Sequence, residues 1–141
     1  QQVGTPYEIY SNPANQFVAD FVGKVNFIKG YSDGGKVTLQ SIDKDIPYDG
    51  KLTGNVIVTV RPENVKLVSR EEAEFAGKLK KSYFLGNEND CFIDINGISI
   101  RVVAPSQAYG SLKPNQDVYL KFEDYIVHED AGNDDVTKIL T

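Results

Sequence analysis

The sequence lacks several features that would define common protein classes. Its 141 residues include one cysteine, one histidine, no methionine and no tryptophan. A single cysteine excludes an internal disulfide and fits a reducing cytosol, and a single histidine excludes a histidine-based metal cluster. No apolar run approaches the roughly 20 residues that a membrane-spanning helix needs. We therefore expect no direct insertion into a membrane.

Positive charge is also scarce. The chain has 15 lysines and arginines against 20 acidic residues, for a net charge of −5. A nucleic-acid-binding domain needs a basic stripe that neutralises phosphates. The local basic cluster Lys78, Lys80 and Lys81 is preceded by glutamates at positions 71, 72 and 74. We interpret this cluster as a solvated strand face and expect no nucleic-acid partner.

Motifs for catalysis and nucleotide binding are missing as well. There is no G-x-x-x-x-G-K-[ST] loop and no aspartate-terminated apolar strand for a magnesium–nucleotide site. We therefore expect no catalytic residue, no metal and no cofactor within these 141 residues. A triad of Ser106, His128 and Asp130 lacks a strained nucleophile turn. His128 is instead expected on an exposed strand end.

The first 23 residues predict two short helices. Thr5 and Glu8 form a capping box, and Pro13 ends the first helix and begins the second. The apolar face of the second helix consists of Phe17, Val18, Phe21 and Val22, of which the first three are the candidate docking residues. This face must dock on another surface, either the β region that follows or an upstream domain. We interpret residues 1–23 as a helical linker with these three docking residues.

From residue 24 the hydrophobic period changes to two, which predicts a mainly β domain over residues 24–141. Asn96-Gly97 is typical of a two-residue type I′ hairpin turn. Such a turn places three pairs on one face: Ile95 with Ile98, Ile93 with Ile100 and Cys91 with Val102. The hairpin therefore predicts that Cys91 is a small core residue.

The β region contains a weak internal repeat at an offset of 60 residues. The matching positions are Gly50, Leu52, Asn55, Val58 and Glu63 with Gly110, Leu112, Asn115, Val118 and Glu123. Either a small β unit was duplicated, or β sequences share such residues by chance. We interpret the repeat as a duplication. Two halves with many short strands, the last near Tyr119–Val127, predict a closed or partly closed barrel.

Pro62 follows the strongly apolar stretch Val56–Val60. Because proline has no N–H for a ladder, the strand must end or bulge there, between Arg61 and Glu63. This segment resembles the Arg-Pro-Glu motif of the transport-associated OB fold, or TOBE domain. The opening segment, Gly4–Asn26, resembles the joint between the ATPase core of a bacterial ABC importer subunit and its C-terminal regulatory domain.

The resemblance implies an OB-like β-barrel that acts as a non-catalytic regulatory and dimerisation domain of an ABC transporter ATP-binding subunit. ATP and magnesium would then bind in an upstream ATPase domain. Since position 1 is not methionine, we expect the chain to be a fragment of such a subunit. The implied partners are a second copy, the ATPase domain and, indirectly, the membrane permease subunits, at the cytoplasmic face of the cell membrane. Maltose, polyamine, iron and sulfate importers all fit.

The candidate dimer and regulatory surface joins the Arg-Pro-Glu segment to its repeat counterpart. It consists of Arg61, Pro62, Glu63, Lys121, Glu123 and Asp124. Five aromatic residues are candidates for interface anchors or for barrel core: Tyr83, Phe84, Tyr109, Tyr119 and Tyr125. Two other functions stay open. One is an oxyanion sensor that uses Lys24, Lys78 and Ser106, and the other is an OB-type nucleic-acid binder, which the acidic balance opposes.

Overall fold

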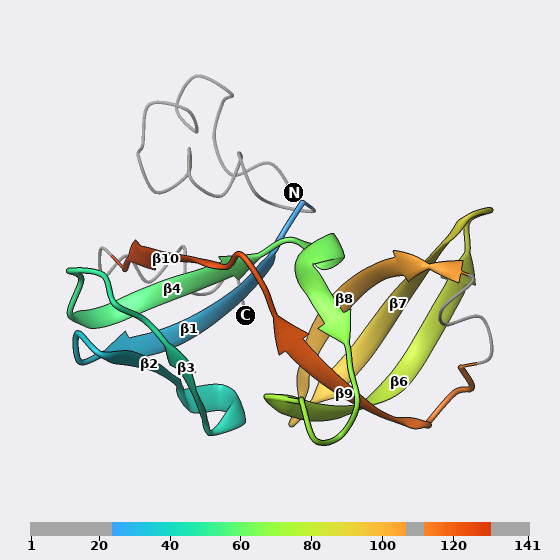
Figure 1. The fold of residues 1–141 in the computed structure, drawn as a ribbon, viewed down its shortest axis with the longest axis horizontal. Coiled ribbons are helices and arrows are strands. Elements are labelled where there is room, and N and C mark those ends of the chain that lie inside the picture. The colour runs from blue at the N-terminus through green and yellow to red at the C-terminus, as the bar shows by residue number, and fades with distance from the viewer. Residues whose placement is uncertain (1–23, 107–111, 131–141) are drawn as a thin grey trace, which may run out of the picture.

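The computed structural model describes residues 24–106 and 112–130, and this part of the chain is mainly β, as the sequence predicts. Its ten strands form two antiparallel five-stranded sheets that lie side by side (Figure 1). The expected N-terminal helices, with Phe17, Val18 and Phe21, lie outside the described residues, as does Tyr109.

The first sheet has the strand order β10-β4-β1-β2-β3. Its strands are β1 (Asn26–Ser32), β2 (Lys36–Leu39), β3 (Lys44–Pro47), β4 (Gly54–Val60) and β10 (Ile126–Glu129), with a short 3₁₀ helix, η1 (Gln40–Ile42), between β2 and β3. The turn after β1 has Gly34 at a φ of 92°. There the Asp33 carboxylate accepts the backbone N–H groups of Gly35 and Lys36, and these bonds lower the pKa of Asp33.

The second sheet has the order β5-β9-β6-β7-β8. Its strands are β5 (Val65–Leu67), β6 (Phe75–Phe84), β7 (Glu88–Ile95), β8 (Ile98–Pro105) and β9 (Asp117–Phe122). The edge strands β5 and β8 also contact each other, so this sheet curls into a nearly closed barrel. The expectation of a single barrel is corrected here, because the strands divide between two sheets.

The hairpin of β7 and β8 confirms the predicted register. Ile95 pairs with Ile98, and the pairs further along the strands also match the prediction. Asn96 and Gly97 have φ angles of 52° and 90°, as a type I′ turn requires. Cys91 is fully buried in the core, and burial raises the pKa of its thiol.

One continuous core joins the two sheets. The cluster of buried apolar side chains includes Ile28, Val37 and Val58 from the first sheet and Leu79, Ile93 and Val118 from the second. Burial of such side chains is the main favourable term in folding. The two sheets therefore share their principal source of stability.

A side-chain amide connects β1 to the free edge of β8. Asn26 is 8% exposed. Its Nδ2 donates to the backbone oxygen of Arg101 at 2.9 Å, and its Oδ1 accepts the backbone N–H of Arg101 at 2.9 Å. Because β8 lies at an edge of its sheet, the amide takes the place of a neighbouring strand at this residue.

We expect the Asn26→Ala substitution to lower the free energy of unfolding by about 1–3 kcal/mol, because it removes both partners of the Arg101 backbone. Urea unfolding followed by circular dichroism measures the change. Asn55→Ala, at an exposed position of β4, is the control and should change stability by less than about 0.5 kcal/mol. Equal changes in the two variants would contradict the structural importance of the amide.

Candidate functional site at the crossing of the two sheets

The two sheets exchange strands at one crossing. β4 belongs to the first sheet, but β5, which follows it, pairs with β9 in the second sheet. β9 continues into β10, which returns to the first sheet and pairs with β4. The expected single last strand near Tyr119–Val127 is therefore two strands in different sheets. The connections at residues 61–64 and 123–125 run between the sheets in opposite directions (Figure 1).

Pro62 determines where the first connection leaves its sheet. Arg61 before it is extended, with φ −70° and ψ 146°, as a residue preceding proline prefers. The short 3₁₀ helix η2 (Pro62–Asn64) then begins with proline at its first position, where a missing N–H is tolerated. The Asn64 N–H donates to the Arg61 oxygen at 2.8 Å and closes this turn. The predicted strand break is confirmed.

The two connections are joined directly by a backbone hydrogen bond. The N–H of Glu123 donates to the backbone oxygen of Asn64 at 2.9 Å. Beside this bond, Lys66 of β5 faces Lys121 of β9 in the strand register. The like charges are separated in part because the Lys66 Nζ donates to the Glu63 backbone oxygen at 2.8 Å. The structure thus brings the two halves of the predicted surface side by side.

The members of the predicted surface differ in exposure. Arg61, Glu63 and Asp124 are exposed, Lys121 and Glu123 are half-buried, and Pro62 is buried. Within residues 24–106 and 112–130, no hydrogen bond or ion pair engages the side chains of Arg61, Lys121 or Asp124. Charges of both signs at the crossing are therefore available to a partner.

An ion pair on β7 and β8 lies near the crossing, and sequence reasoning missed it. Arg101 binds Asp90 with two parallel contacts, Nε to Oδ1 at 2.8 Å and Nη2 to Oδ2 at 3.0 Å. The hydrogen bond to Asp90 raises the pKa of Arg101, and the negative charges of Asp90 and Glu63 add to this effect. The predicted hairpin register already placed Arg101 and Asp90 on the same face, and that was the available signal.

The second connection is anchored to the first sheet by Tyr125. Its hydroxyl donates to the backbone oxygen of Pro47 on β3, and burial raises the pKa of this hydroxyl. Tyr125 and Tyr119 are half-buried, whereas Tyr83 and Phe84 are exposed. Of the aromatic candidates that the structure describes, those on β9 and in the second connection pack into the protein, and those at the end of β6 face solvent.

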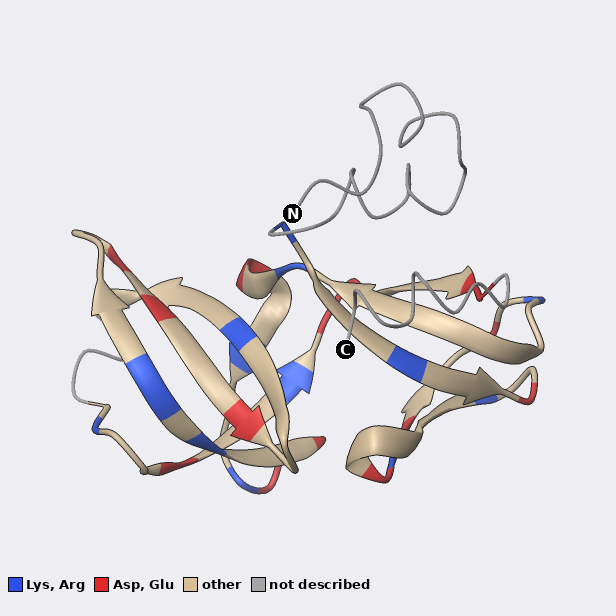
Figure 2. Ribbon diagram, turned by 180° about the vertical axis from the view of Figure 1, so that it is seen from behind, with Lys and Arg blue, Asp and Glu red and all other residues tan. Residues whose placement is uncertain are grey.

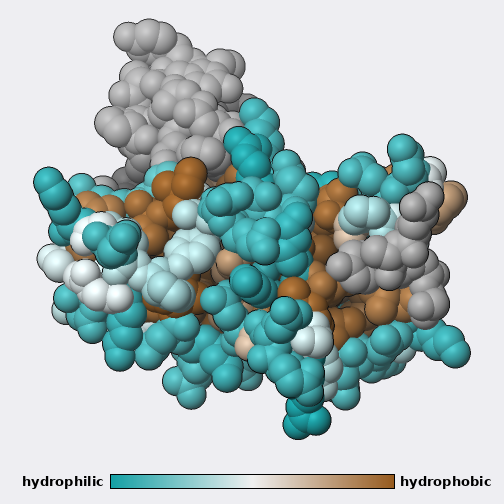
Figure 3. All heavy atoms as spheres, in the orientation of Figure 1, coloured by the Kyte–Doolittle hydropathy of each residue, from teal (hydrophilic) through white to brown (hydrophobic). Residues whose placement is uncertain are grey.

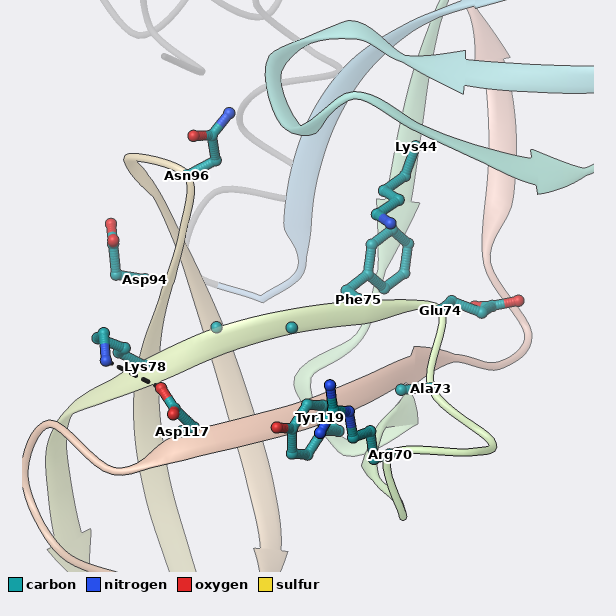
Figure 4. A pocket seen from close by; sticks show the side chains of 12 residues that line it. Lys44, Arg70, Ala73, Glu74, Phe75, Lys78, Asp94, Asn96, Asp117 and Tyr119 are labelled. Atoms are coloured by element: carbon teal, nitrogen blue, oxygen red, sulfur yellow. Dashed lines mark hydrogen bonds and ion pairs between the residues drawn. The ribbon is translucent and has the colours of Figure 1, made fainter.

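Two residues of the oxyanion hypothesis, Lys78 and Ser106, are not assembled. Lys78 lines an open groove of about 590 Å³, where its Nζ pairs with Asp117 at 2.9 Å (Figure 4). Ser106 lies at the other end of β7, where its N–H donates to the Asn87 oxygen and its Oγ contacts Asn89. Lys78 faces Asp94 in the strand register, and five residues of strand separate Asp94 from Asn89, roughly 17 Å.

The charged residues of the groove come from both sheets. Figure 4 shows Lys44 reaching over from the first sheet toward Phe75, with Arg70 and Tyr119 on the other side. Cations and carboxylates alternate in this lining, and Figure 2 shows the same mixture over the second sheet. Such a surface does not favour a simple anion. Oxyanion binding through Lys24, Lys78 and Ser106 remains a prediction without a preformed site.

The part of the chain that the structure describes has neither a metal site nor a membrane-spanning helix. No three histidine, cysteine, aspartate or glutamate side chains gather there as a metal site needs. No helix in those segments is long and apolar enough to cross a bilayer.

His128 is placed differently from the prediction of an exposed strand end. It is half-buried on β10, and its Nε2 lies 2.9 Å from the hydroxyl of Thr59 on β4. Burial lowers the pKa of His128. The ring therefore helps to hold the returning strand β10 on β4 in its neutral form.

Protonation of His128 should weaken the fold. The pKa in the folded chain lies below the ordinary 6.5, so the neutral ring stabilises the fold above about pH 6.5, and this contribution is lost as the pH falls through the folded pKa. Unfolding free energies measured at about pH 7.5 and about pH 5 should fall more in the native chain than in His128→Gln. Equal losses in both proteins would contradict this coupling.

Comparison with known proteins supports one family. The model of the TOBE domain matches residues 58–128, which include the crossing. The chain is 30% identical to the spermidine/putrescine import ATP-binding protein PotA of Malacoplasma penetrans, covering 97% of this chain and 24% of that protein. It is 31% identical to the Fe(3+) ions import ATP-binding protein FbpC of Fusobacterium nucleatum, covering 86% of this chain and 34% of that protein.

A further PotA protein, from Clostridioides difficile, is 35% identical over 69% of this chain and 28% of its own length. The chain thus spans about a quarter to a third of the length of these curated relatives. Among solved structures, the cytoplasmic molybdate-binding protein ModG, with molybdate bound, superposes with a TM-score of 0.65 at 14% identity. The match covers 77% of this chain and 98% of ModG. The two-sheet fold, the Arg-Pro-Glu crossing and the matched residues together show that this chain belongs to the TOBE domain family.

Proposed function

We propose that the chain is the non-catalytic C-terminal domain of an ABC importer ATP-binding subunit, where it regulates ATP-driven solute import and helps two subunits to pair. The observation that carries the proposal is the pattern of coverage. Nearly the whole chain aligns with about a quarter of an import ATP-binding protein, and the chain itself has no phosphate-binding loop. The nucleotide chemistry of the parent subunit would then lie upstream.

The crossing is the contact surface in this proposal. A two-fold interface is self-complementary, so the same patch must carry both signs of charge. The crossing meets this requirement with Arg61 and Lys121 beside Glu63, Glu123 and Asp124. The buried Pro62 holds the first connection on the body of the domain. Because the buried Pro62 fixes the backbone here, the charged side chains beside it start from defined positions, which favours a specific contact.

The exchanged strands suit a domain that transmits movement. β5 follows β4 of the first sheet and pairs with β9 of the second, whereas β10 follows β9 and pairs with β4. The core is also continuous between the sheets. A displacement applied to one sheet is therefore passed to the other without bending a flexible joint. A regulatory domain that tethers two moving ATPase cores needs this stiffness.

The further partners follow from the same proposal. Residues 1–23, with Phe17, Val18 and Phe21, would dock the domain onto the ATPase core, which binds ATP and magnesium. The permease subunits would be indirect partners, and the assembly would lie at the cytoplasmic face of the cell membrane. Polyamines and iron(III) appear in the names of the relatives. We expect solute choice to rest with the binding protein and the membrane subunits.

The coding gene offers the most direct test. Its sequence upstream of Gln1 should encode an ATPase domain with a G-x-x-x-x-G-K-[ST] loop. The proposal would be overturned if the gene encoded no such loop upstream of Gln1 and no neighbouring gene encoded one either.

Charge reversal at the crossing tests the role of the surface. In the complete subunit, the double substitution Arg61→Glu with Lys121→Glu should weaken subunit pairing, measured by sedimentation, and change ATP hydrolysis by the assembled transporter. Both positions lack side-chain partners among the described residues, so the unfolding free energy should change by less than about 0.5 kcal/mol per site.

The matched control carries the same change of charge away from the crossing. Lys51→Glu with Lys113→Glu alters two exposed lysines elsewhere on the domain. This variant should pair and hydrolyse ATP like the native subunit. If both double variants behave alike, the crossing has no special role in pairing.

A further inference from the structure

Among the described residues, the C-terminal end of β6 pairs with a strand on only one of its two sides. β6 (Phe75–Phe84) pairs with β9 over Phe75–Lys78 and with β7 over Lys78–Phe84. A bulge between Leu79 and Lys81 separates these two stretches. Beyond the bulge, the outer side of β6 is therefore an open sheet edge within the part of the chain that the structure describes.

The alternation of hydrogen bonds identifies which groups face outward. Leu85 N–H donates to the Glu88 oxygen at 2.7 Å, so this pair is hydrogen-bonded. Along an antiparallel ladder, hydrogen-bonded and non-hydrogen-bonded residue pairs alternate. Tyr83 is therefore also hydrogen-bonded to β7, whereas the backbone N–H and C=O groups of Ser82 and Phe84 point away from β7. The Ser82 Oγ lies 3.6 Å from the Cys91 Sγ, as expected for a close, non-bonded pair.

Large apolar side chains gather at this edge. Tyr83 is 50% exposed, Phe84 is 73% exposed and Leu85 is 57% exposed. Beside them lies a hollow of about 480 Å³ whose apolar lining includes Leu79 and Leu112. Figure 3 shows hydrophobic surface at this end of the second sheet. Open edges with apolar side chains pair readily with a further strand.

Resting on the proposed pairing of two subunits, we propose that β6 of a second copy occupies this edge, as an antiparallel strand related by a two-fold axis at Tyr83. This contact is an alternative to the crossing as the place where the two-fold axis lies. This register uses all the outward groups, because Ser82 of each copy faces Phe84 of the other. Four main-chain hydrogen bonds result. In a register centred on Ser82, only Ser82 would form main-chain hydrogen bonds with its own copy, and Phe84 would have no regular strand partner. A register centred on Phe84 would leave Ser82 without one in the same way.

Side-chain chemistry favours the same register. Tyr83 faces Tyr83 of the second copy, and aromatic cross-strand pairs are stabilising. Lys81 faces Leu85 of the second copy, so no lysine opposes a lysine. A strand with its charges at one end and its apolar residues at the other is complementary to itself when reversed. This complementarity selects a second copy over an unrelated strand.

The contact is small and suits subunits that are already held together. Three partly exposed side chains provide roughly 300–400 Å² per copy. The total of about 600–800 Å² for two copies is below the roughly 1,200 Å² found in stable interfaces. The isolated chain should therefore pair weakly. Two copies tethered in one transporter would be at a high effective concentration, which makes a weak contact effective.

Disulfide trapping tests the register in the isolated chain. In a Cys91→Ser background, Tyr83→Cys should form a covalent dimer under mild oxidation, because facing Cα atoms in this kind of pair lie about 4.5 Å apart. Lys81→Cys, also at an exposed position, should not, because its two copies would lie roughly 13 Å apart. An equimolar mixture of Lys81→Cys and Leu85→Cys should cross-link as a heterodimer, since these positions face each other.

Non-reducing gels and intact mass spectrometry measure the products. Absence of the Tyr83→Cys dimer, or equal cross-linking of Tyr83→Cys and Lys81→Cys, would overturn the proposal. If the Cys91→Ser background fails to fold, the native Cys91 can remain, because it is fully buried.

The two proposals fail separately. A phosphate loop upstream of Gln1 with no cross-linking at Tyr83 would retain the subunit assignment and remove this interface. Cross-linking without such a loop would retain the interface and remove the assignment.

Discussion

Each sheet of this domain takes its outermost strand from the other half of the chain. β5 completes the second sheet and β10 completes the first. A strand without a neighbour leaves its backbone groups unpaired, so neither sheet is complete until both halves have folded. The crossing, with the buried Pro62 and the Glu123–Asn64 bond, is where this exchange is fixed. The exchange places the two sheets against a common core and brings the charged residues of the two connections together.

The two sheets also correspond to the two halves of the internal repeat. The orders β10-β4-β1-β2-β3 and β5-β9-β6-β7-β8 correspond strand by strand when β1 to β4 are matched with β6 to β9. Val58 on β4 and Val118 on β9, which match at the offset of 60, then occupy corresponding strands in the two sheets. We propose that a β unit was duplicated and that its last strand was exchanged between the copies.

Local signals in the sequence were sufficient for local structure. The Asn96-Gly97 turn and the alternation around it determined the hairpin register, because turn geometry and side-chain direction have to agree. Pro62 marked the strand break for a similar reason. The partner sheet of β5 and β10 was not predictable, since either sheet offers them an apolar face and an open edge. His128 was misplaced because its burial depends on β4, a strand distant in the sequence. The Asp90–Arg101 pair followed from the hairpin register and was overlooked.

The amide of Asn26 occupies an unusual position in this arrangement. It lies at the first residue of β1. Its partner Arg101 also holds Asp90 through the guanidinium group. Asn26 also stands opposite Val60 in the β1–β4 ladder, so it takes part in both sheets. The Asn26 amide therefore links the start of the first sheet directly to the edge strand of the second.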